Sequence, residues 1–568
     1  MRSRISSVSS SKWSDPPLPA RLSQGIRHPI VAGVLLCSVY VALSFANDPR
    51  GFLGTDTGAK VATVKVMSER GTFVPDLGYF AAAADPSGRH HPMVSSYRSG
   101  DIFVGVTSLP MVLAAKPLWD IGGYRAALLL PMLGAVAAAF AARALAAACS
   151  PPAADSAFWL VGITSPLLLY AVDLWEHAPG VALMLWALVW LHRSLRGPWV
   201  WSFAGGAALG VAFSMRTEAV VYAAAMFLTV QGLLWHGRQR ARATRIGLAC
   251  GVGFAVPALA NDLLERWVVG TSFRAGRASG FVGDAGSNLA RRALESFVTA
   301  VSPFPSFDSG LLVLALAFAT ALVVLGRWGS DPRRQRVCIG LLVVVGYCYV
   351  LRFASGPGFV PGALAAAPVA AVALARGWRP PVARDATLLA LVPLPIVFAF
   401  QLPGGALPQW GGRYFLTTTL ALVAIGATRL PALMPFVRVT LLGFSLAVAA
   451  FGAAWMVLRT HAVADAGELL LARPEPVLIS PDGFPPREFA ATYPERRWLT
   501  VVARDELPGA IRVAEGLGLT SFAVVAQCPG VESPVPSFPG WQAVSTEAVA
   551  FLPNCDFRVT SYVRSARP

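Results

Sequence analysis

The run from Pro29 to Ala46 reads PIVAGVLLCSVYVALSFA and contains no charged side chain. At about 1.5 Å per residue, a helix of this length reaches about 27 Å, close to the ~30 Å hydrocarbon core of a bilayer. A strand would leave its N–H and C=O groups without partners in lipid, so the run predicts a transmembrane helix. Residues 1–28 are rich in Ser and Arg, and Asn47 to Arg50 is a poor cleavage site. We therefore expect a retained first span and not a cleaved signal peptide.

Comparable apolar runs recur along most of the 568 residues. Hydrophobic residues make up 55% of the chain and charged residues 14%, against roughly 25% charged in ordinary soluble domains. The predicted spans are 29–46, 126–147, 156–172, 179–192, 199–214, 217–235, 246–266, 309–326, 337–353, 361–375, 386–402, 414–428 and 439–457. The sequence thus predicts an α-helical polytopic membrane protein with about thirteen transmembrane helices.

The net charge of +16 is a topology signal. The excess Arg lies in short loops between apolar runs and not in one stripe with stacking aromatics, which argues against nucleic acid as a partner. Six basic segments should face the cytoplasm: residues 2–27, 193–196, 238–245, 327–336, 376–384 and 429–438. Two loops on the same side of the membrane must be separated by an even number of spans. The predicted spans meet this condition if the run 102–118 does not cross. This run contains Pro110 and Lys116, and we expect it to be a re-entrant or juxtamembrane helix on the outer face. The alternative is that 102–118 crosses and a neighbouring run does not.

This topology divides the chain into three parts. We expect a cytoplasmic tail at 1–28, a transmembrane domain at 29–457 with a long outer loop at 47–125, and an extracytoplasmic domain at 458–568. The protein is predicted to lie in the plasma (inner) membrane with a cytoplasmic N-terminus. Long ordered loops usually carry function, so the outer loop is the first place to look for a site.

Asp56 lies just after the first span and before a predicted helix at 59–70 that contains Lys60. One interpretation is that Asp56 or Thr55 caps this helix. The other is that Asp56 is a general base at the membrane rim, where partial burial raises the pKa of a carboxyl group.

A second acidic group occupies a short outer turn, where Asp173, Glu176 and His177 separate two apolar runs. These residues either mark the edge of the bilayer, as Trp175 would, or serve function, since ionisable groups near lipid are costly.

Basic residues are predicted on the same face: Arg216, near Glu218, then Arg352, and Arg413 beside Tyr414. A guanidinium at head-group level suits bidentate phosphate binding, and phospholipid anchoring is the alternative. The adjacent His90 and His91 point apart in either helix or strand and have no acidic partner at ligand spacing, so we assign no metal site there.

These features together resemble the C-type membrane glycosyltransferases. The resemblance rests on Asp56 early in a long outer loop, the Tyr-Arg-Ser-Gly-Asp segment of Tyr97 to Asp101 leading to Pro110, the acidic turn at 173–176, and the late Gly-Gly-Arg-Tyr of Gly411 to Tyr414. The chain is most similar to protein O-mannosyltransferases and lipid A aminoarabinose transferases, the family 39-like enzymes, over about residues 29–457.

The resemblance implies transfer of a sugar from a polyprenyl-phosphate donor to an acceptor hydroxyl of a protein, lipid or polysaccharide. Asp56 would be the base, and Asp173 or Glu176 the second acid. The residues expected to bind substrate are Lys60, His91, Tyr97, Arg98, His177, Arg216, Glu218, Arg352, Arg413 and Tyr414. The chain departs from the family's pattern in two places. Asp56-Thr57 stands where the first loop usually has an Asp-Glu pair, and His91-Pro92-Met93-Val94 stands where the aminoarabinose transferases have a Lys-Pro-Pro-Leu-like segment. Participation of a divalent cation therefore stays open.

From residue 458 onward the composition is that of a soluble domain. We expect strands at 476–480, 497–503 and 521–526, helices at 486–493 and 506–517, and an antiparallel pair at 548–552 and 557–563, which together make a small α/β domain. Cys528 and Cys555 could pair in an oxidising compartment. Without a nucleotide fingerprint or a catalytic triad, the domain is predicted to gate the site or bind acceptor.

Two other classes of protein fit part of the pattern. A secondary transporter also has about a dozen spans, but it tends to place ionisable residues in interrupted helices near the midplane. A noncatalytic assembly protein would tolerate replacement of Asp56 and Glu176.

Overall fold

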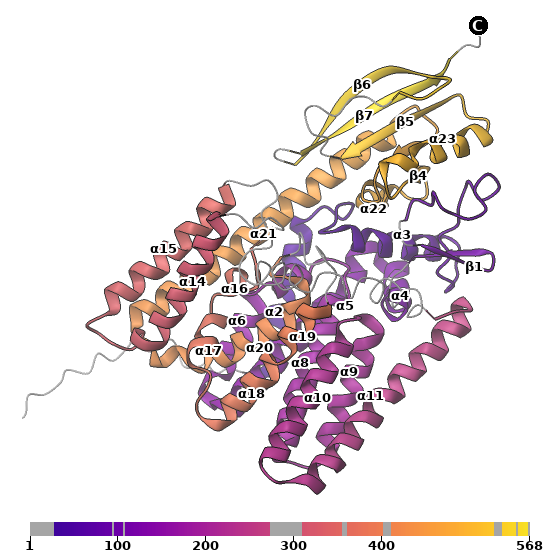
Figure 1. Cartoon of the computed structure of the whole chain (residues 1–568). Coiled ribbons are helices and arrows are strands. Elements are labelled where there is room, and N and C mark those ends of the chain that lie inside the picture. Colours follow the sequence, from indigo (N-terminus) through magenta and orange to yellow (C-terminus); the bar gives the residue numbers. More distant parts are fainter. Residues whose placement is uncertain are drawn as a thin grey trace, which may run out of the picture.

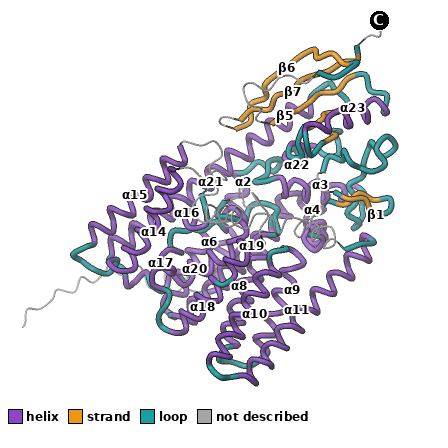
Figure 2. The backbone as a smooth tube through the Cα atoms, viewed as in Figure 1, coloured by secondary structure: helices purple, strands orange, loops and turns teal. Residues whose placement is uncertain are grey.

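The computed structural model describes residues 28–93, 96–105, 108–272, 309–354, 361–400, 410–527, 537–552 and 555–565. A body of helices carries a small sheet domain at one end (Figure 1 and Figure 2). The helices of the first half are α2 (Pro29–Ala46), α3 (Thr55–Glu69), α4 (Leu109–Ala127), α5 (Leu129–Cys149), α6 (Ala154–Ile163), α7 (Leu167–Tyr170), α8 (His177–Ser194), α9 (Val200–Met215), α10 (Ala219–His236) and α11 (Arg240–Val269). Those of the second half of the body are α14 (Ser309–Trp328), α15 (Gln335–Ala354), α16 (Ala363–Ala366), α17 (Ala370–Arg376), α18 (Pro381–Leu391), α19 (Pro393–Phe400), α20 (Leu416–Ala427) and α21 (Pro435–Leu471).

The predicted spans correspond to these helices, although not always to one helix each. Among the described residues, five helices are long and apolar enough to cross a bilayer: α2, α5, α10, α11 and α21. Three predicted spans are instead broken near Pro166, Pro368 and Pro393, because proline lacks the N–H that a continuous helix requires. The protein is an integral membrane protein, and the number thirteen stays a prediction.

The basic loops meet at one end of the body. Hydrogen bonds or ion pairs join Arg242 to Gly197, Arg196 to Asp385, Arg376 to Ser330, and Arg429 to the carbonyl of Arg379. Five of the six segments that the sequence places in the cytoplasm thus belong to one layer of loops; the sixth, 2–27, lies outside the described residues.

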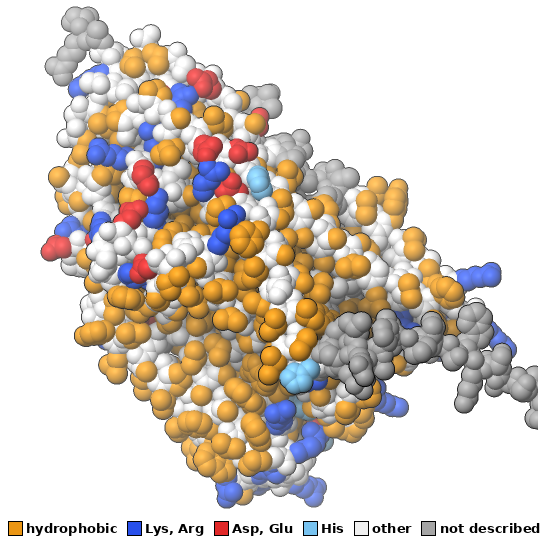
Figure 3. All heavy atoms as spheres, turned by 180° about the vertical axis from the view of Figure 1, so that it is seen from behind, with side chains coloured by type: hydrophobic (Ala, Val, Ile, Leu, Met, Phe, Trp, Pro, Cys, Tyr) orange, Lys and Arg blue, Asp and Glu red, His pale blue; other side chains and the backbone are white. Residues whose placement is uncertain are grey.

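Figure 3 shows the complementary pattern on the surface. Hydrophobic side chains cover a broad face of the helical body, acidic and basic side chains gather together toward the sheet domain, and basic side chains gather at the opposite end. A wide apolar face is expected where lipid contacts a membrane protein. We call the end that carries the sheet domain the outer end, in keeping with the predicted topology.

The run predicted as a re-entrant or juxtamembrane helix forms β2 (Ile102–Val104) and then α4. Near its start, Ser108 donates to the carbonyl of Ser214 at 3.3 Å, and near its end Tyr124 donates to Asp173 at 3.2 Å. Asp173 belongs to the turn predicted at the outer face, and Ser214 is the last residue of the span 199–214, which is predicted to end at that face. The two ends of α4 therefore lie at the same end of the body, as a helix that follows the membrane surface would require.

Helix α21 joins the body to the sheet domain. Its 37 residues reach about 55 Å, well beyond what a bilayer requires. One continuous helix thus runs through the domain boundary predicted at 457 and ends at Leu471, and the boundary itself stays a prediction. The outer part of α21 packs under the first loop, where Thr460 accepts from the Asp48 N–H at 3.2 Å.

The C-terminal domain contains the predicted α/β layer. Its elements are β3 (Leu478–Ser480), α22 (Pro485–Glu488), β4 (Trp498–Thr500), α23 (Leu507–Gly516), β5 (Ser521–Gln527), β6 (Trp541–Leu552) and β7 (Cys555–Arg564). The strand order is β4-β3-β5-β7-β6, with β3 parallel to β4 and β5, and β7 antiparallel to β5 and β6. The side chains of Cys528 and Cys555 lie outside the described residues, so their pairing stays a prediction.

The first loop forms a layer between the helical body and the C-terminal domain (Figure 1). It contains α3 and the small antiparallel pair of β1 (Tyr97–Ser99) and β2. Ala81 is buried in the same apolar core as Ile479 and Val501 of the sheet. Loop and domain thus share a core, which ties the domain to the segment that contains Asp56.

Candidate active site

Asp56 lies at the centre of a charged cluster at the outer end of the body. Helix α3 begins at Thr55 and is preceded by Gly54, so the predicted capping role of Asp56 or Thr55 is wrong. The Asp56 carboxylate instead accepts from Arg413 Nη1 at 2.6 Å and pairs with Arg487 of the C-terminal domain. With 35% of its side chain exposed, Asp56 is the most accessible member of the cluster.

The two guanidinium groups decide the protonation state of Asp56. Burial alone would raise the pKa of this carboxyl group, but the positive charges of Arg413, Arg487 and Lys60 together lower it well below its ordinary range. Asp56 is therefore ionised at neutral pH.

Arg413 reaches this position because two glycines precede it. Gly411 and Gly412 have φ angles of 72° and 65°, which side chains rarely allow. A Cβ atom at position 411 would also lie 2.3 Å from Cγ of Pro166, at the break between α6 and α7. The turn is fixed by Tyr170, whose hydroxyl donates to the Trp410 carbonyl at 2.8 Å.

The Arg413 guanidinium lies among aromatic rings and retains a free donor. Its central carbon is 4.6 Å from the centre of the Tyr414 ring and 6.0 Å from that of Trp175, within the range of cation–π contact. Arg413 Nε is buried and has no hydrogen-bond partner in the part of the chain that the structure describes. A buried donor of this kind is suited to an anionic ligand.

A chain of buried charges continues from Asp56 toward the acidic turn. Lys60, one turn along α3, donates to the Asp56 carbonyl at 3.0 Å and pairs with Glu176 at 2.8 Å. Arg216 Nη1 lies 3.8 Å from Glu176, and Arg216 Nε donates to Glu218 at 2.5 Å. Burial would raise the pKa of Glu176, but Lys60 and Arg216 lower it.

Asp173 belongs to the cluster but faces inward. It is 2% exposed and accepts from the Leu53 N–H at 3.2 Å, from Thr57 at 2.5 Å and from Tyr124 at 3.2 Å. Burial raises its pKa to about 6, although the bond from Thr57 opposes that change. These bonds tie the start of α3 to the acidic turn, which is a positioning role.

The charges of the cluster nearly balance, and they balance fully when Asp173 is ionised. Four cationic side chains, Lys60, Arg216, Arg413 and Arg487, face the carboxylates of Asp56, Glu176 and Glu218. Whenever Asp173 carries its proton, four positive charges oppose three negative ones.

His177 closes one wall of the cluster. It is fully buried, with its ring centre 4.0 Å from Trp175 and 5.1 Å from the stacked ring of Tyr170. Arg216 Nη1 lies 2.6 Å from His177 Nδ1. The structure therefore brings together the predicted residues Asp56, Lys60, Asp173, Glu176, His177, Arg216, Glu218, Arg413 and Tyr414.

Two predicted substrate-binding residues do not join the cluster. His91 bonds to the Gly78 carbonyl at 3.0 Å and stacks on Phe103, and burial lowers its pKa to about 4. Arg98 is exposed and donates to the carbonyls of Gly100 and Pro86. Both therefore organise the first loop.

Two more predictions cannot be followed to a side chain. Tyr97 lies in β1 and Arg352 in α15, and both side chains lie outside the described residues. Within the described ranges, no three His, Cys, Asp or Glu side chains are placed to hold a metal ion.

Arg487 was missed by sequence reasoning. It lies in Pro-Pro-Arg-Glu, in a segment predicted as an ordinary helix of the C-terminal domain. No local pattern distinguishes it from the other arginines of that domain, because its role depends on how the domain packs against α3.

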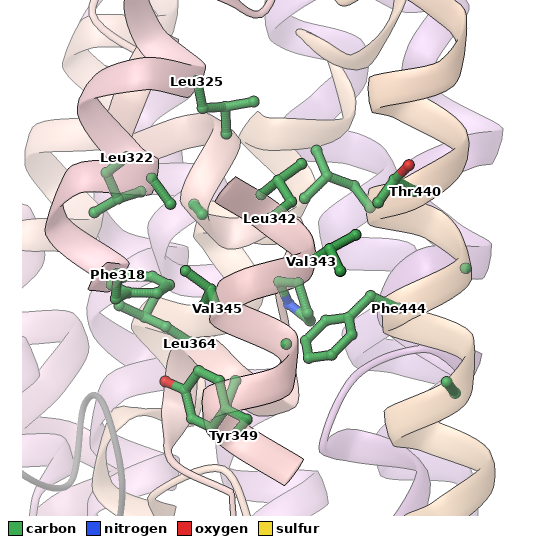
Figure 4. Close-up of a pocket in the computed structure, with 18 of the residues that line it drawn as sticks. Phe318, Leu322, Leu325, Leu342, Val343, Val345, Tyr349, Leu364, Thr440 and Phe444 are labelled. Carbon is green, nitrogen blue, oxygen red and sulfur yellow. The ribbon is translucent and has the colours of Figure 1, made fainter. Parts of the chain in front are cut away.

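A cavity of about 410 Å³ opens between α14, α15 and α21, with α16 and α17 behind (Figure 4). Phe318, Leu342, Tyr349 and Phe444 point into it, and the lining is almost entirely apolar. Leu364 and Ala365 of α16 form part of its wall. The neighbouring Ala366 lies 3.5 Å from where a Cβ of Gly411 would be, so α16 separates the cavity from the loop that presents Arg413.

No family model matches the chain, and no curated protein matches it. Among solved structures, ArnT from Cupriavidus metallidurans is similar in its apo state (14% identity, TM-score 0.40) and bound to undecaprenyl phosphate (13%, 0.42). Both comparisons cover 93% of this chain and 97% of ArnT. The archaeal oligosaccharyltransferase AglB from Archaeoglobus fulgidus, in complex with an inhibitory peptide and a dolichol-phosphate, is similar over 87% of this chain and 69% of its own (14%, 0.44).

ArnT is a lipid A aminoarabinose transferase of the C-type glycosyltransferases. At these identities and TM-scores, the similarity assigns no role to any residue of this chain.

Proposed function

We propose that the chain is a membrane glycosyltransferase that moves a sugar from a polyprenyl-phosphate donor to an acceptor hydroxyl at the outer end of the helical body. The observation that carries the proposal is the pairing of Asp56 with Arg413, where a reachable carboxylate lies against a guanidinium whose Nε has no partner among the described residues. One group can take a proton and the other can hold a phosphate.

In the proposed reaction, Asp56 accepts the proton of the acceptor hydroxyl as the acceptor oxygen attacks the anomeric carbon of the sugar. The bond between that carbon and the phosphate oxygen breaks, and the electron pair leaves with the polyprenyl phosphate. Arg413 stabilises the charge that develops on this leaving group, as fixed donors do best in a site with little water. Lys60 holds Glu176 and the start of α3, so it keeps the base in place.

The apolar cavity in Figure 4 supports a lipid-linked donor. A polyprenyl chain must stay in an apolar environment while its phosphate reaches the charged cluster. The cavity lies in the helical body, and α16, which forms part of its wall, lies between it and the Arg413 loop on that side. We assign the cavity to part of the donor's isoprenoid chain.

Transport is the rival function, and the broken helices bear on it. Transporters use interrupted helices to place ionisable groups at the midplane. The breaks here, at residues 163–167, 367–370 and 391–394, contain no ionisable side chain. They therefore favour no transport site.

The direct test is Asp56→Asn, which keeps the size of the side chain but removes the base. We expect transfer from a polyprenyl-phosphate sugar in purified membranes to fall by about 10²- to 10⁴-fold. Asp101→Asn is the matched control, since Asp101 is a fully exposed carboxylate of the same loop. Wild-type transfer by the Asp56→Asn protein would overturn the assignment of the base.

A further inference from the structure

The C-terminal domain reaches the cluster through the short helix α22, which lies against α3. A Cβ atom at position 58 would lie 1.7 Å from the carbonyl oxygen of Arg487, so only glycine allows this approach. Arg487 Nε donates to the Thr55 carbonyl at 3.2 Å, and its Nη2 bonds to Asp56. Arg487 thus bonds to both the backbone and a side chain at the start of α3.

The residue after Arg487 is anchored from the other side. Glu488 is buried and pairs with Arg459 of α21. Arg459 Nε also donates to the carbonyls of Phe52 and Leu53, at 3.2 and 3.0 Å. Helix α22 is therefore held between α3 and α21, which fixes the point from which the Arg487 side chain extends.

The domain has further contacts with the first loop that do not involve Arg487. Tyr493 donates to the Leu77 carbonyl at 2.7 Å, and Lys65 pairs with Glu495 at 2.7 Å. His90 exchanges two hydrogen bonds with the backbone of Thr500. Replacing the Arg487 side chain should therefore leave the domain docked.

We propose, on the basis of the proposed transferase function, that Arg487 is a positioning residue of the active site, which holds the Asp56 carboxylate in place for proton transfer. The C-terminal domain is then part of the active site. This role goes beyond the gating or acceptor binding that the sequence alone suggested for the domain.

The charged groups that face Asp56 are Arg413 from the 410–415 turn, Lys60 from α3 and Arg487 from α22. Arg413 and Arg487 each bond to a different oxygen of the Asp56 carboxylate. Without the Arg487 side chain, one carboxylate oxygen loses its donor, and the carboxylate is held from the Arg413 side alone.

The test is the steady-state kinetics of the full chain in membranes, with a polyprenyl-phosphate sugar as donor. In Arg487→Gln we expect kcat to fall by about tenfold while KM for the donor stays close to that of wild type, because the base is misplaced but the Arg413 phosphate site is kept. Arg487→Lys keeps the charge and should restore most of the wild-type kcat. Lys65→Gln removes a domain contact that does not touch Asp56 and should leave kcat and KM unchanged.

A wild-type kcat in Arg487→Gln, or an equal fall in kcat in Lys65→Gln, would overturn the proposal. Melting temperatures of Arg487→Gln, Asp56→Asn and the double variant add a readout that needs no activity. We expect the two substitutions to be strongly non-additive, since they break one interaction, and additive effects would contradict the contact. If wild-type chain transfers no sugar, the proposed function itself fails. If wild type is active and only the Arg487 results are negative, this inference alone fails.

Discussion

Asp173 is a buried carboxyl group whose structural role depends on the hydrogen bonds that it accepts more than on its charge. Its three donors, Leu53, Thr57 and Tyr124, come from segments that are distant in the sequence. Burial still raises its pKa to about 6, so the folded protein holds this proton more tightly than the unfolded chain does. The stability that results is present below the ordinary pKa of 3.8 and is lost as pH rises through about 6.

We therefore expect Asp173→Asn to remove part of the pH dependence of stability. The difference in melting temperature between wild type and variant in detergent should change across pH 4 to 6, in favour of the variant as pH rises. Asp101→Asn should show no such change, because its side chain is exposed. A constant difference between wild type and Asp173→Asn across this range would show that the carboxyl group titrates normally.

Sequence reasoning located most of the cluster but not all of its members. Asp56, Glu176, Arg216 and Arg413 could be predicted because each is a charged residue at a span boundary on one face, where polar groups converge. His91 and Arg98 were included on a short motif, and a motif does not say which way a side chain turns. Arg487 had no signal, because its contact joins residues 431 positions apart.

At the scale of single elements, hydrophobic runs and basic loops predicted the helices and their order along the chain. They did not predict the breaks within three spans, although the prolines at those breaks are visible in the sequence. Nor did they predict that α21 continues past residue 457 to Leu471. The start of α3 is the clearest case. A capping role was a reasonable alternative for Asp56, and tertiary contacts with Arg413 and Arg487 determined the outcome instead.

The cavity among α14, α15 and α21 allows a prediction at the same scale. Gly443 lines it, and a Cβ at this position would meet no atom within 4 Å, so Gly443→Phe should fill space without a clash. If an isoprenoid chain lies there, the variant should raise KM for a long-chain donor. If the Phe side chain displaces two CH₂ groups of the donor, the loss of about 0.8 kcal/mol for each corresponds to a rise in KM of about tenfold.

A donor with a very short chain should be used equally well by wild type and Gly443→Phe. Gly340→Phe is the control, because Gly340 of α15 also faces open space but does not line the cavity. An equal rise in KM for short and long donors, or the same effect in Gly340→Phe, would show that the cavity does not hold the chain.

At the scale of the whole molecule, three layers meet at the cluster: the helical body, the first loop and the C-terminal domain (Figure 1). The body supplies Arg216 and Arg413, the loop supplies Asp56 and Lys60, and the domain supplies Arg487. A donor whose chain lies in lipid and whose phosphate lies in the cluster would contact the boundary between the first two layers. This arrangement is consistent with a reaction at the membrane surface.

The most direct measurement is an experimental structure of the full chain with polyprenyl phosphate added. We predict density for the phosphate within hydrogen-bond distance of Arg413, next to the Asp56 carboxylate, with the isoprenoid chain directed toward the cavity of α14, α15 and α21. Phosphate bound elsewhere, with Asp56 and Arg413 still paired only to each other and to Arg487, would contradict the account.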